Sequence, residues 1–335
     1  MNTRMHCCPD YHPPPDPCLQ ASLVSAWLSP SRRHFSTFLL LLLLTLCLPA
    51  AAQEVDAMQA QHVIVISIDG LRPDAIARAH AAHLQELIGQ GSYYPEAQTV
   101  RPSETVPAQV SMITGLDPKA HQVIWNRYRR GYYTGTTIFS VAKKAGLSTA
   151  LLFAKKKLNY LVNPNHIDFV YGKRPPPYRP MDTTAAGLAA AFARAWQAHT
   201  YALVLVHIRE PDSAGHRYGW MSRPYLSAVE EADRAIGFIV SALRRSGTWD
   251  KTALIITADH GGRGLRHAQP HRENLTIPWI TVGPGIPAGL RLQRAISIYD
   301  TAPTALAFLG LSMPGDVDGT VVTEVVQKSH RLRAP

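Results

Sequence analysis

Apolar and polar positions alternate in blocks along the chain from residue 62 onward. Short apolar runs rich in β-branched residues predict strands, and stretches with apolar residues three and four positions apart predict helices. Several of the helical stretches stop at a glycine, which is a common helix end. The predicted strands are residues 62–69, 147–154, 201–208, 252–259 and 277–283, and the predicted helices are residues 74–91, 137–146, 183–199, 225–247 and 301–310.

This alternation of strands and helices predicts the α/β class. Continuously apolar strands indicate a mostly parallel central sheet that is covered by helices on both faces. No internal repeat breaks the pattern, and the proline-rich residues 171–182 are expected to form a rim loop rather than a domain linker. We therefore expect a single domain over residues 53–335, with a short lid that includes residues 155–182.

The first 52 residues have a different pattern. A basic start at Arg32 and Arg33 is followed by an apolar run, Phe38–Leu48, and by the small residues Ala50–Ala52. This order predicts a secretory signal that is cleaved before Gln53. The run is shorter than the roughly 20 residues that span a bilayer. We expect a secreted or periplasmic protein without stable membrane insertion, and an uncleaved anchor is the alternative.

Cysteine usage and charge narrow the chemistry. The four cysteines all lie in the segment that cleavage would remove, so the mature chain would have neither disulfides nor cysteine ligands or nucleophiles. Residues 53–335 contain 31 Lys and Arg against 22 Asp and Glu, a net charge of +9. Such a balance suits anionic substrates. Because the charges are scattered, no nucleic-acid partner is expected.

Acidic residues and histidines follow three of the predicted strands. They are Asp69, the pair Asp212 and His216, and the pair Asp259 and His260. Each has a simpler interpretation alone: a surface i,i+4 pair, or a carboxylate that caps a helix or turn. Ligand sites of parallel sheets form at the carboxyl ends of strands, where these side chains would meet. Carboxylate and imidazole ligands suit zinc-like metals, and their number favours two ions.

A hydroxyl group is expected beside the same edge. In residues 101–115, Pro107 is a favourable first helical residue, which would place Thr105 at a helix N-terminus with free backbone N–H groups. Such a position binds anions. A threonine hydroxyl is a poor nucleophile unless a metal or a base lowers its pKa. Alone, Thr105 would be interpreted as a helix cap.

Six short motifs carry a resemblance to a known family over about residues 62–325. They occur in the order VISIDGLRPD, PSETVPAQVSMITGLDPKAHQV, REPDSAGHRYG, ITADHGG, IPWITVGPGI and YDTAPTALAFLGL. Together they resemble the alkaline phosphatase superfamily, near its nucleotide pyrophosphatase/phosphodiesterase and phosphonoacetate hydrolase branches. The resemblance implies an alkaline phosphatase-like fold and a metal-dependent phosphoric ester hydrolase that works through a phosphothreonine intermediate on Thr105.

The resemblance also implies a site with two Zn²⁺ ions, with other divalent metals as alternatives. Asp69, Asp259 and His260 would hold the ion that activates Thr105, and Asp212, His216 and a later histidine would hold the other. The later histidine is His267 or His271, and the small residue that follows His267 favours it.

Departures from the family patterns bear on the substrate. Where nucleotide phosphodiesterases place two base-stacking aromatic rings, this chain has Val106 and His207. Their absence is unfavourable for a nucleotide specialist, although tyrosines of a loop (Tyr128, Tyr132 or Tyr133) could replace them. Asn126 occupies the place of an asparagine that binds a phosphoryl oxygen in other branches. The simpler interpretation of Asn126 is a loop amide.

The run of three lysines at 155–157 resembles a lysine-x-lysine pattern of the phosphonoacetate hydrolase branch. On an extended segment, Lys155 and Lys157 would point the same way, and two ammonium groups favour a dianionic phosphate monoester. The alternatives are a phosphodiesterase or nucleotide pyrophosphatase, a phosphonate hydrolase, and a non-catalytic binder of small phosphorylated ligands. The segment TVPA lacks the sulfatase cysteine or serine pattern, so sulfate ester hydrolysis is not expected.

Overall fold

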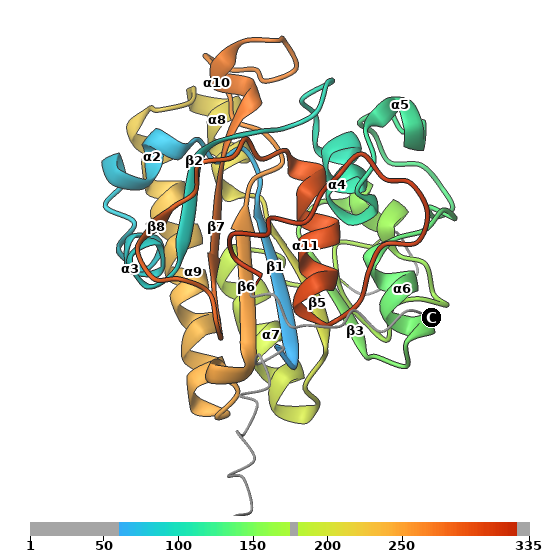
Figure 1. The fold of residues 1–335 in the computed structure, drawn as a ribbon. Helices are drawn as coiled ribbons and strands as arrows, with labels where there is room; N and C mark the ends of the chain where they lie inside the picture. The colour runs from blue at the N-terminus through green and yellow to red at the C-terminus, as the bar shows by residue number, and fades with distance from the viewer. Residues whose placement is uncertain (1–59, 175–179, 327–335) are drawn as a thin grey trace, which may run out of the picture. The chain divides into compact units, whose positions relative to one another are not determined.

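A computed structural model describes residues 60–174 and 180–326 of the chain. Its centre is an eight-stranded sheet in the order β4-β3-β5-β1-β6-β7-β2-β8 (Figure 1). β7 runs antiparallel to its neighbours β6 and β2, and the other pairings are parallel. The strands are β1 (His62–Ile68), β2 (Ser92–Gln98), β3 (Thr149–Phe153), β4 (Phe169–Gly172), β5 (Leu203–Ile208), β6 (Thr252–Thr257), β7 (Thr276–Val282) and β8 (Leu290–Arg291).

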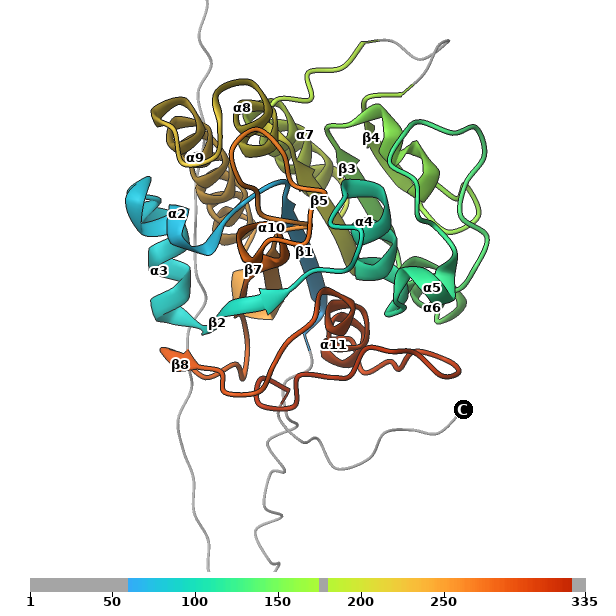
Figure 2. The same cartoon turned by 90° about the horizontal axis from the view of Figure 1, so that it is seen from above.

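Helices cover both faces of this sheet, as the sequence predicted. Helices α3, α7 and α9 lie on one face, and α4, α6 and α11 lie on the other (Figure 2). Every residue of β1, β5 and β6 is buried, which explains why these strands are continuously apolar. The helices are α2 (Pro73–Arg78), α3 (Ala82–Gln90), α4 (Thr105–Thr114), α5 (Pro118–His121), α6 (Ile138–Lys144), α7 (Ala185–Ala198), α8 (Glu210–Tyr218), α9 (Arg223–Arg245), α10 (Arg272–Leu275) and α11 (Thr301–Phe308), with short 3₁₀ helices η1 (Lys156–Leu161), η2 (Trp249–Lys251) and η3 (Ile298–Asp300).

The single helix predicted over residues 74–91 is wrong. The structure has two helices there, α2 and α3, and His80 between them has a positive φ of 49°. The second helix begins at Ala82 because the Asp233 carboxylate of α9 accepts hydrogen bonds from the backbone N–H groups of His83 (3.2 Å) and Leu84 (2.8 Å). A side chain from a distant helix thus sets this boundary.

The helix that carries Thr105 begins earlier than predicted. Thr105 is its first residue and Pro107 its third, because α4 starts directly after the extended Glu104. Thr105 still lies in the first turn, where backbone N–H groups lack intrahelical partners.

Some predictions concern residues outside the described ranges. The expected signal sequence, its cysteines and the domain boundary at residue 53 all fall there and stay predictions. Within residues 60–174 and 180–326, no helix combines the length and the hydrophobicity needed to cross a bilayer.

Part of the expected lid over residues 155–182 belongs to the sheet instead, since β4 pairs with β3 at one end of the strand order.

Candidate metal centre and active site

Three acidic segments meet at the carboxyl edge of the sheet. Strands β3, β5, β1 and β6 are parallel neighbours, so the residues that follow them lie side by side. β1 leads into Asp69, β6 into Asp259 and His260, and β5 into α8, whose first turn carries Asp212. β3 leads to Lys155 at the same edge. The fold therefore collects at one place the residues that the sequence analysis selected.

A glycine turn holds two of the carboxylates together. Gly70 has a φ of 75°, and a Cβ atom there would lie 3.0 Å from Asp212 Cα, so a side chain at this position would be strained. The close approach lets the Asp212 N–H donate to the Asp69 carbonyl (3.0 Å). The Trp220 indole and the Tyr225 hydroxyl both donate to the Gly70 carbonyl at 2.9 Å. These hydrogen bonds to the Asp69 and Gly70 carbonyls hold the turn in place.

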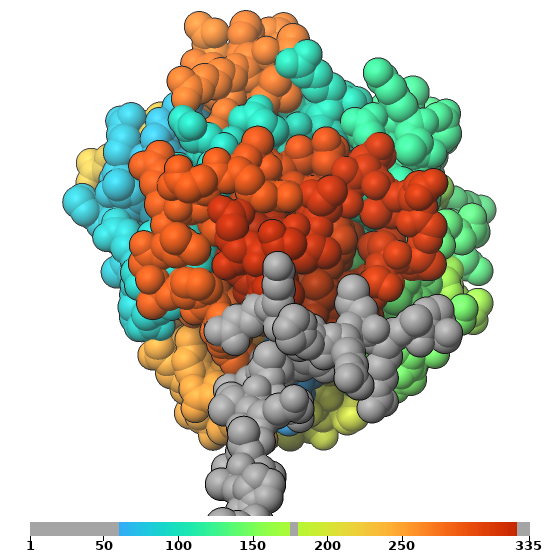
Figure 3. Space-filling model, viewed as in Figure 1, coloured from blue at the N-terminus to red at the C-terminus, as the bar shows by residue number. Residues whose placement is uncertain are grey.

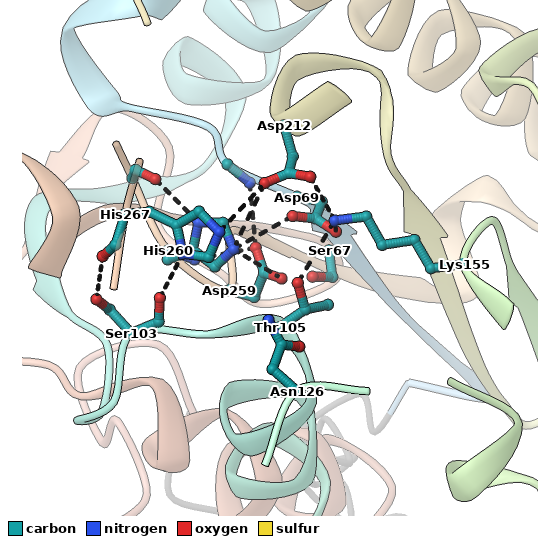
Figure 4. A network of polar contacts seen from close by, with 12 residues as sticks. Ser67, Asp69, Ser103, Thr105, Asn126, Lys155, Asp212, Asp259, His260 and His267 are labelled. Carbon is teal, nitrogen blue, oxygen red and sulfur yellow. Dashed lines mark hydrogen bonds and ion pairs between the residues drawn. The ribbon is translucent and has the colours of Figure 1, made fainter. Parts of the chain in front are cut away.

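Asp69, Asp259 and His260 form what we call the inner cluster. All three side chains are fully buried, and His260 Nε2 lies 3.4 Å from Asp69 Oδ1 and 3.7 Å from Asp259 Oδ2 (Figure 4). Among the residues that the structure describes, none of these three atoms has a hydrogen-bond partner. Buried polar atoms are almost always hydrogen-bonded, so their convergence points to a cation as the missing partner.

Asp212, His216 and His267 form the outer cluster. His216 lies one helical turn after Asp212 on α8, with its Nε2 3.3 Å from Asp212 Oδ1. His267 Nε2 lies 3.1 Å from His216 Nε2 and 3.7 Å from Asp212 Oδ1. Two imidazole nitrogens and one carboxylate oxygen are thus close enough to share one ion.

The histidines of both clusters are oriented by backbone carbonyls. In each, Nδ1 contacts a carbonyl oxygen: Gly261 for His260 (2.9 Å), Leu265 for His216 (3.0 Å) and Ser103 for His267 (2.7 Å). A carbonyl oxygen can only accept, so we assign the proton of the neutral ring to Nδ1. Each Nε2 is then left with its lone pair, as a metal ligand requires. The space-filling view shows the loop before α10, which carries His267, rising beside the chain that leads into α4 (Figure 3).

His260 faces both clusters, and His207 adds to the inner one. His260 Nε2 is also 3.8 Å from Asp212 Oδ1, and its ring stacks on that of His267 with centroids 3.7 Å apart. His207 Nε2 lies 2.9 Å from Asp69 Oδ2. Two groups of buried side chains have ligand atoms within 4.8 Å of one another: Asp212, His260 and His267, and Asp69, His207 and Asp259.

Sequence reasoning missed the role of His207, which it treated only as the place of an absent ring. A signal was present: His207 is a polar residue inside the apolar run of β5. In the structure it is fully buried and paired in register with Ser67, two residues before Asp69.

Thr105 lies beside the carboxylates, next to an ammonium group. Lys155 Nζ is 2.5 Å from Asp69 Oδ2, 2.5 Å from Asp212 Oδ2 and 3.5 Å from Thr105 Oγ1. Thr105 is fully buried. Lys155 therefore bridges one carboxylate of each cluster and approaches the hydroxyl group.

Asn126 contacts the same helix N-terminus. Its Oδ1 accepts hydrogen bonds from the Val106 N–H at 3.2 Å and from Lys157 Nζ at 2.7 Å. The expected extended segment at the lysines is wrong, since η1 begins at Lys156. Lys155 and Lys157 nevertheless both point to the site. Lys156 instead lies over the Tyr128 ring, 4.6 Å from its centroid.

The charges at the site are unbalanced. Burial alone would lower the pKa of Lys155, but the carboxylates of Asp69, Asp212 and Asp259 outweigh it and raise this pKa above its usual value. Burial, with the Asp69 carboxylate nearby, raises the pKa of Asp259 to about 7. Burial lowers the pKa of His267 to about 3, so its imidazole is neutral at pH 7. Burial, with Lys155 nearby, lowers the pKa of Lys157. Three carboxylates therefore exceed the positive charge of the two lysines, which favours a further cation.

The structure thus brings together Thr105, Asn126, both lysines and all six expected aspartate and histidine ligands. Of the two alternatives for the last ligand, His267 lies in the outer cluster. His271 is exposed and contacts Gln269 and Arg263 instead. Which residues bind metal stays a prediction.

Comparisons with known proteins identify the family. Residues 63–276 match the family model of type I phosphodiesterases/nucleotide pyrophosphatases. A bis(5'-adenosyl)-triphosphatase, enpp4, of Xenopus laevis is 25% identical over 59% of this chain and 46% of its own length. Arylsulfatase K of Bos taurus is 33% identical over 28% of this chain and 18% of its own length. The chain thus spans about half or less of the length of these curated relatives.

Solved structures share the fold. Murine ectonucleotide pyrophosphatase/phosphodiesterase 5, an inactive variant in complex with AMP, superposes with a TM-score of 0.63 at 15% identity, over 78% of this chain and 97% of the other. A sulfatase of Bacteroides thetaiotaomicron superposes with a TM-score of 0.64 at 16% identity, over 81% and 77%. The fold is therefore alkaline phosphatase-like, as expected from the sequence. With the family model matching well over half of its residues, this chain belongs to the type I phosphodiesterase/nucleotide pyrophosphatase family.

Proposed function

We propose that the protein is a metal-dependent phosphoric ester hydrolase with Thr105 as its nucleophile. One observation carries this proposal: four buried atoms that lack hydrogen-bond partners within the described residues converge beside the Thr105 hydroxyl. They are Asp69 Oδ1, Asp212 Oδ1, Asp259 Oδ2 and His260 Nε2. Family membership supports the same chemistry.

The donor atoms fit two zinc ions. The inner cluster with Thr105 would hold one ion, and the outer cluster would hold the other. Oxygen and imidazole donors without sulfur suit Zn²⁺, and other divalent ions are the alternative. When bound, such a pair of ions supplies Lewis acidity to the attacking and leaving oxygens of an in-line displacement.

The residues of the chain would perform the transfer in two steps. In the first, Thr105 Oγ forms a bond to phosphorus, the bond to the ester oxygen breaks, and the proton of the hydroxyl group leaves with the alcohol. In the second, water attacks the phosphothreonine, the Oγ–P bond breaks and phosphate is released. The proton balance is complete, because water supplies the hydrogen that Thr105 regains.

Two neighbours would support the attack. The Lys155 ammonium, 3.5 Å from Thr105 Oγ1, favours the ionised hydroxyl. Because it is charged at neutral pH, Lys155 acts as a fixed cation and not as a base. Asn126 Oδ1 already accepts two hydrogen bonds, so the amide nitrogen is the group left to donate to a phosphoryl oxygen.

For the substrate we propose small phosphate esters, with a preference for monoesters. Lys155 and Lys157 near Thr105 favour a dianion. A phosphodiesterase or nucleotide pyrophosphatase activity is the second candidate, because the family and enpp4 of Xenopus laevis favour it. A phosphonate hydrolase is the third candidate. A non-catalytic binder is disfavoured, because binding alone does not require the Thr105 hydroxyl.

Hydrolysis by the purified protein tests these candidates. p-Nitrophenyl phosphate, its bis-ester, a dinucleotide and phosphonoacetate would be compared with zinc and after chelation. Thr105→Ala should lower turnover by about a thousandfold or more, the scale seen on removing a catalytic nucleophile, while Thr105→Ser keeps a hydroxyl and should retain part of it. A leading diester would reverse the monoester preference. Turnover that survives both chelation and Thr105→Ala would refute the mechanism.

A further inference from the structure

Positive charge is concentrated in one segment beside the site. Residues 118–167 contain nine lysines and arginines and no aspartate or glutamate. Four of these cations lie on or against the loop that follows α5. We call residues 125–133, together with Lys156 and Tyr160, the basic loop surface. In Figure 3 the teal and green chain around α5 lies at the upper right.

Aromatic contacts give the basic loop surface a defined shape. The Tyr133 N–H donates to the Tyr160 carbonyl at 2.8 Å, and the Trp125 and Tyr160 rings meet edge to face with centroids 4.6 Å apart. The Arg129 guanidinium lies 4.5 Å from the centroid of the Trp125 ring. The loop therefore presents its cations from a packed base of aromatic rings.

The cations of this surface lack acidic partners. Within residues 60–174 and 180–326, Arg127, Arg129, Arg130 and Lys156 form no ion pair with a carboxylate. By contrast, Lys143 of the same segment pairs with Asp168 at 2.6 Å. The three arginines are also exposed. Exposed cations without a carboxylate partner create a positive potential that attracts anions.

The basic loop surface begins where the candidate active site ends. Asn126, which contacts the N-terminus of the Thr105 helix, directly precedes Arg127. The two lysines of η1 contact different regions. Lys157 contacts Asn126 at the candidate site, and Lys156 lies over the Tyr128 ring of the basic loop surface. Asn126 and Lys157 therefore connect the loop to the first turn of the helix that carries Thr105.

We propose that the basic loop surface binds a second phosphate group of the substrate, so that the preferred substrates carry two phosphates. This inference rests on the proposed hydrolase function. The planar fork of arginine matches phosphate oxygens in a bidentate way. A stacked nucleic-acid base fits less well, because cations already cover the faces of Trp125 and Tyr128.

Binding to zinc-loaded Thr105→Ala protein tests the proposal without turnover. Fructose 1,6-bisphosphate and fructose 6-phosphate would be compared by calorimetry at low and moderate salt. We expect the bisphosphate to bind about tenfold more tightly, as for one added set of charge-assisted hydrogen bonds. Changing Arg127, Arg129 and Arg130 together to glutamine should remove most of this advantage and its salt dependence.

A matched triple variant controls for charge. Lys119, Lys143 and Lys144 belong to the same acid-free segment but lie outside the basic loop surface, so their change to glutamine should leave the tenfold ratio intact. Lys156→Gln removes one cation without changing the arginines, which covers the case in which the arginine triple variant does not fold. It should lower the ratio by about twofold to threefold.

The outcomes separate this inference from the proposed function. Equal affinity for the two sugars, or a ratio unchanged in both variants of the surface, would overturn the inference while leaving hydrolysis of simple esters untouched. Tighter binding of a short oligothymidylate than of the bisphosphate would also overturn it, in favour of nucleic acid. If the protein with Thr105 intact hydrolyses no ester, the proposed function fails, whatever the binding ratio.

Discussion

The inner and outer clusters contain similar side chains but differ in how the fold holds them. Asp69, Asp259 and His260 directly follow two central strands, and their side chains are fully buried. The outer cluster belongs to α8 and to the loop before α10. The side chain of its member His216 is 47% exposed.

We expect this difference to affect how firmly each cluster would hold an ion. The register of β1 against β6 places the residues that directly follow these two central strands side by side. The outer cluster depends on a helix end and on a loop that Ser103 holds through its contacts with His267. We therefore expect the outer cluster to release an ion more readily than the inner one.

The largest effect is expected from Asp69→Asn in the inner cluster. Asp69 contacts His260, His207 and Lys155, so losing its charge weakens the metal site and leaves Lys155 with one carboxylate fewer. We expect kcat/KM for the best ester to fall by about a thousandfold or more, with at least one metal equivalent lost. Steady-state kinetics and metal analysis of the purified protein measure both.

Asp74→Asn is the matched control, because Asp74 is exposed and, within the part of the chain that the structure describes, pairs only with Arg72 in a salt bridge of 2.7 Å. Its kinetics and metal content should stay within about twofold of the unchanged protein. Full metal content and activity in Asp69→Asn would show that the Asp69 carboxylate is not a metal ligand.

A smaller effect is expected from His216→Ala in the outer cluster. Asp212 and His267 remain, so one ion should bind more weakly while the inner ion stays. We expect about one metal equivalent to be lost on dialysis and turnover to fall by about a hundredfold, with partial recovery in excess zinc. The exposed His271→Ala should change neither. The reverse pattern would show that His271 is the ligand.

His207→Leu tests whether His207, a neighbour of the inner cluster, strengthens ion binding there. The variant deprives Asp69 Oδ2 of a partner at 2.9 Å inside the core. We expect the affinity for the inner ion to fall by about 10- to 100-fold, as for outer-shell partners of metal ligands, and the outer ion to be unaffected. His207→Gln, whose amide can donate to Asp69, should recover part of the affinity. Equal weakening of both ions would indicate a general loss of packing.

The sequence predicted the parts of this molecule that follow from local pattern. Burial on both faces makes β1, β5 and β6 apolar throughout, so they could be found from their runs. β2 was missed because its sequence, SYYPEAQ, contains a proline and is only partly buried. The break before α3 depends on Asp233, which is distant in sequence, and no local pattern reports it.

The same limit applies to the candidate site. Carboxylates at strand ends could be selected because parallel strands meet at one edge, whichever strands are neighbours. The contact of His207 with Asp69 depends on the order β5-β1, and the position of Lys155 between Asp69 and Asp212 depends on β3 lying beyond β5. Such contacts require the topology, which composition and spacing do not contain.

Lys155→Met is expected to give the smallest effect. It tests the difference between the inner and outer clusters most directly, because Lys155 contacts one carboxylate of each. Without metal, Asp69 and Asp212 would lose a shared partner in the protein interior, so we expect the melting temperature of the metal-free protein to fall by about 5 °C or more. With metal the sign should reverse. An ion would no longer compete with the ammonium for the two carboxylates, so zinc should bind severalfold more tightly at both clusters.

Lys156→Met removes a lysine from the same run but leaves both clusters untouched, so it should change neither quantity. Calorimetry of the metal-free and zinc-loaded proteins measures both signs in one experiment. If Lys155→Met tightens zinc at one cluster alone, the ammonium belongs to that cluster and does not bridge the two. If zinc binds more weakly to Lys155→Met, Lys155 orients the carboxylates for the ions, and the inner and outer clusters share a positioning residue instead of a competitor.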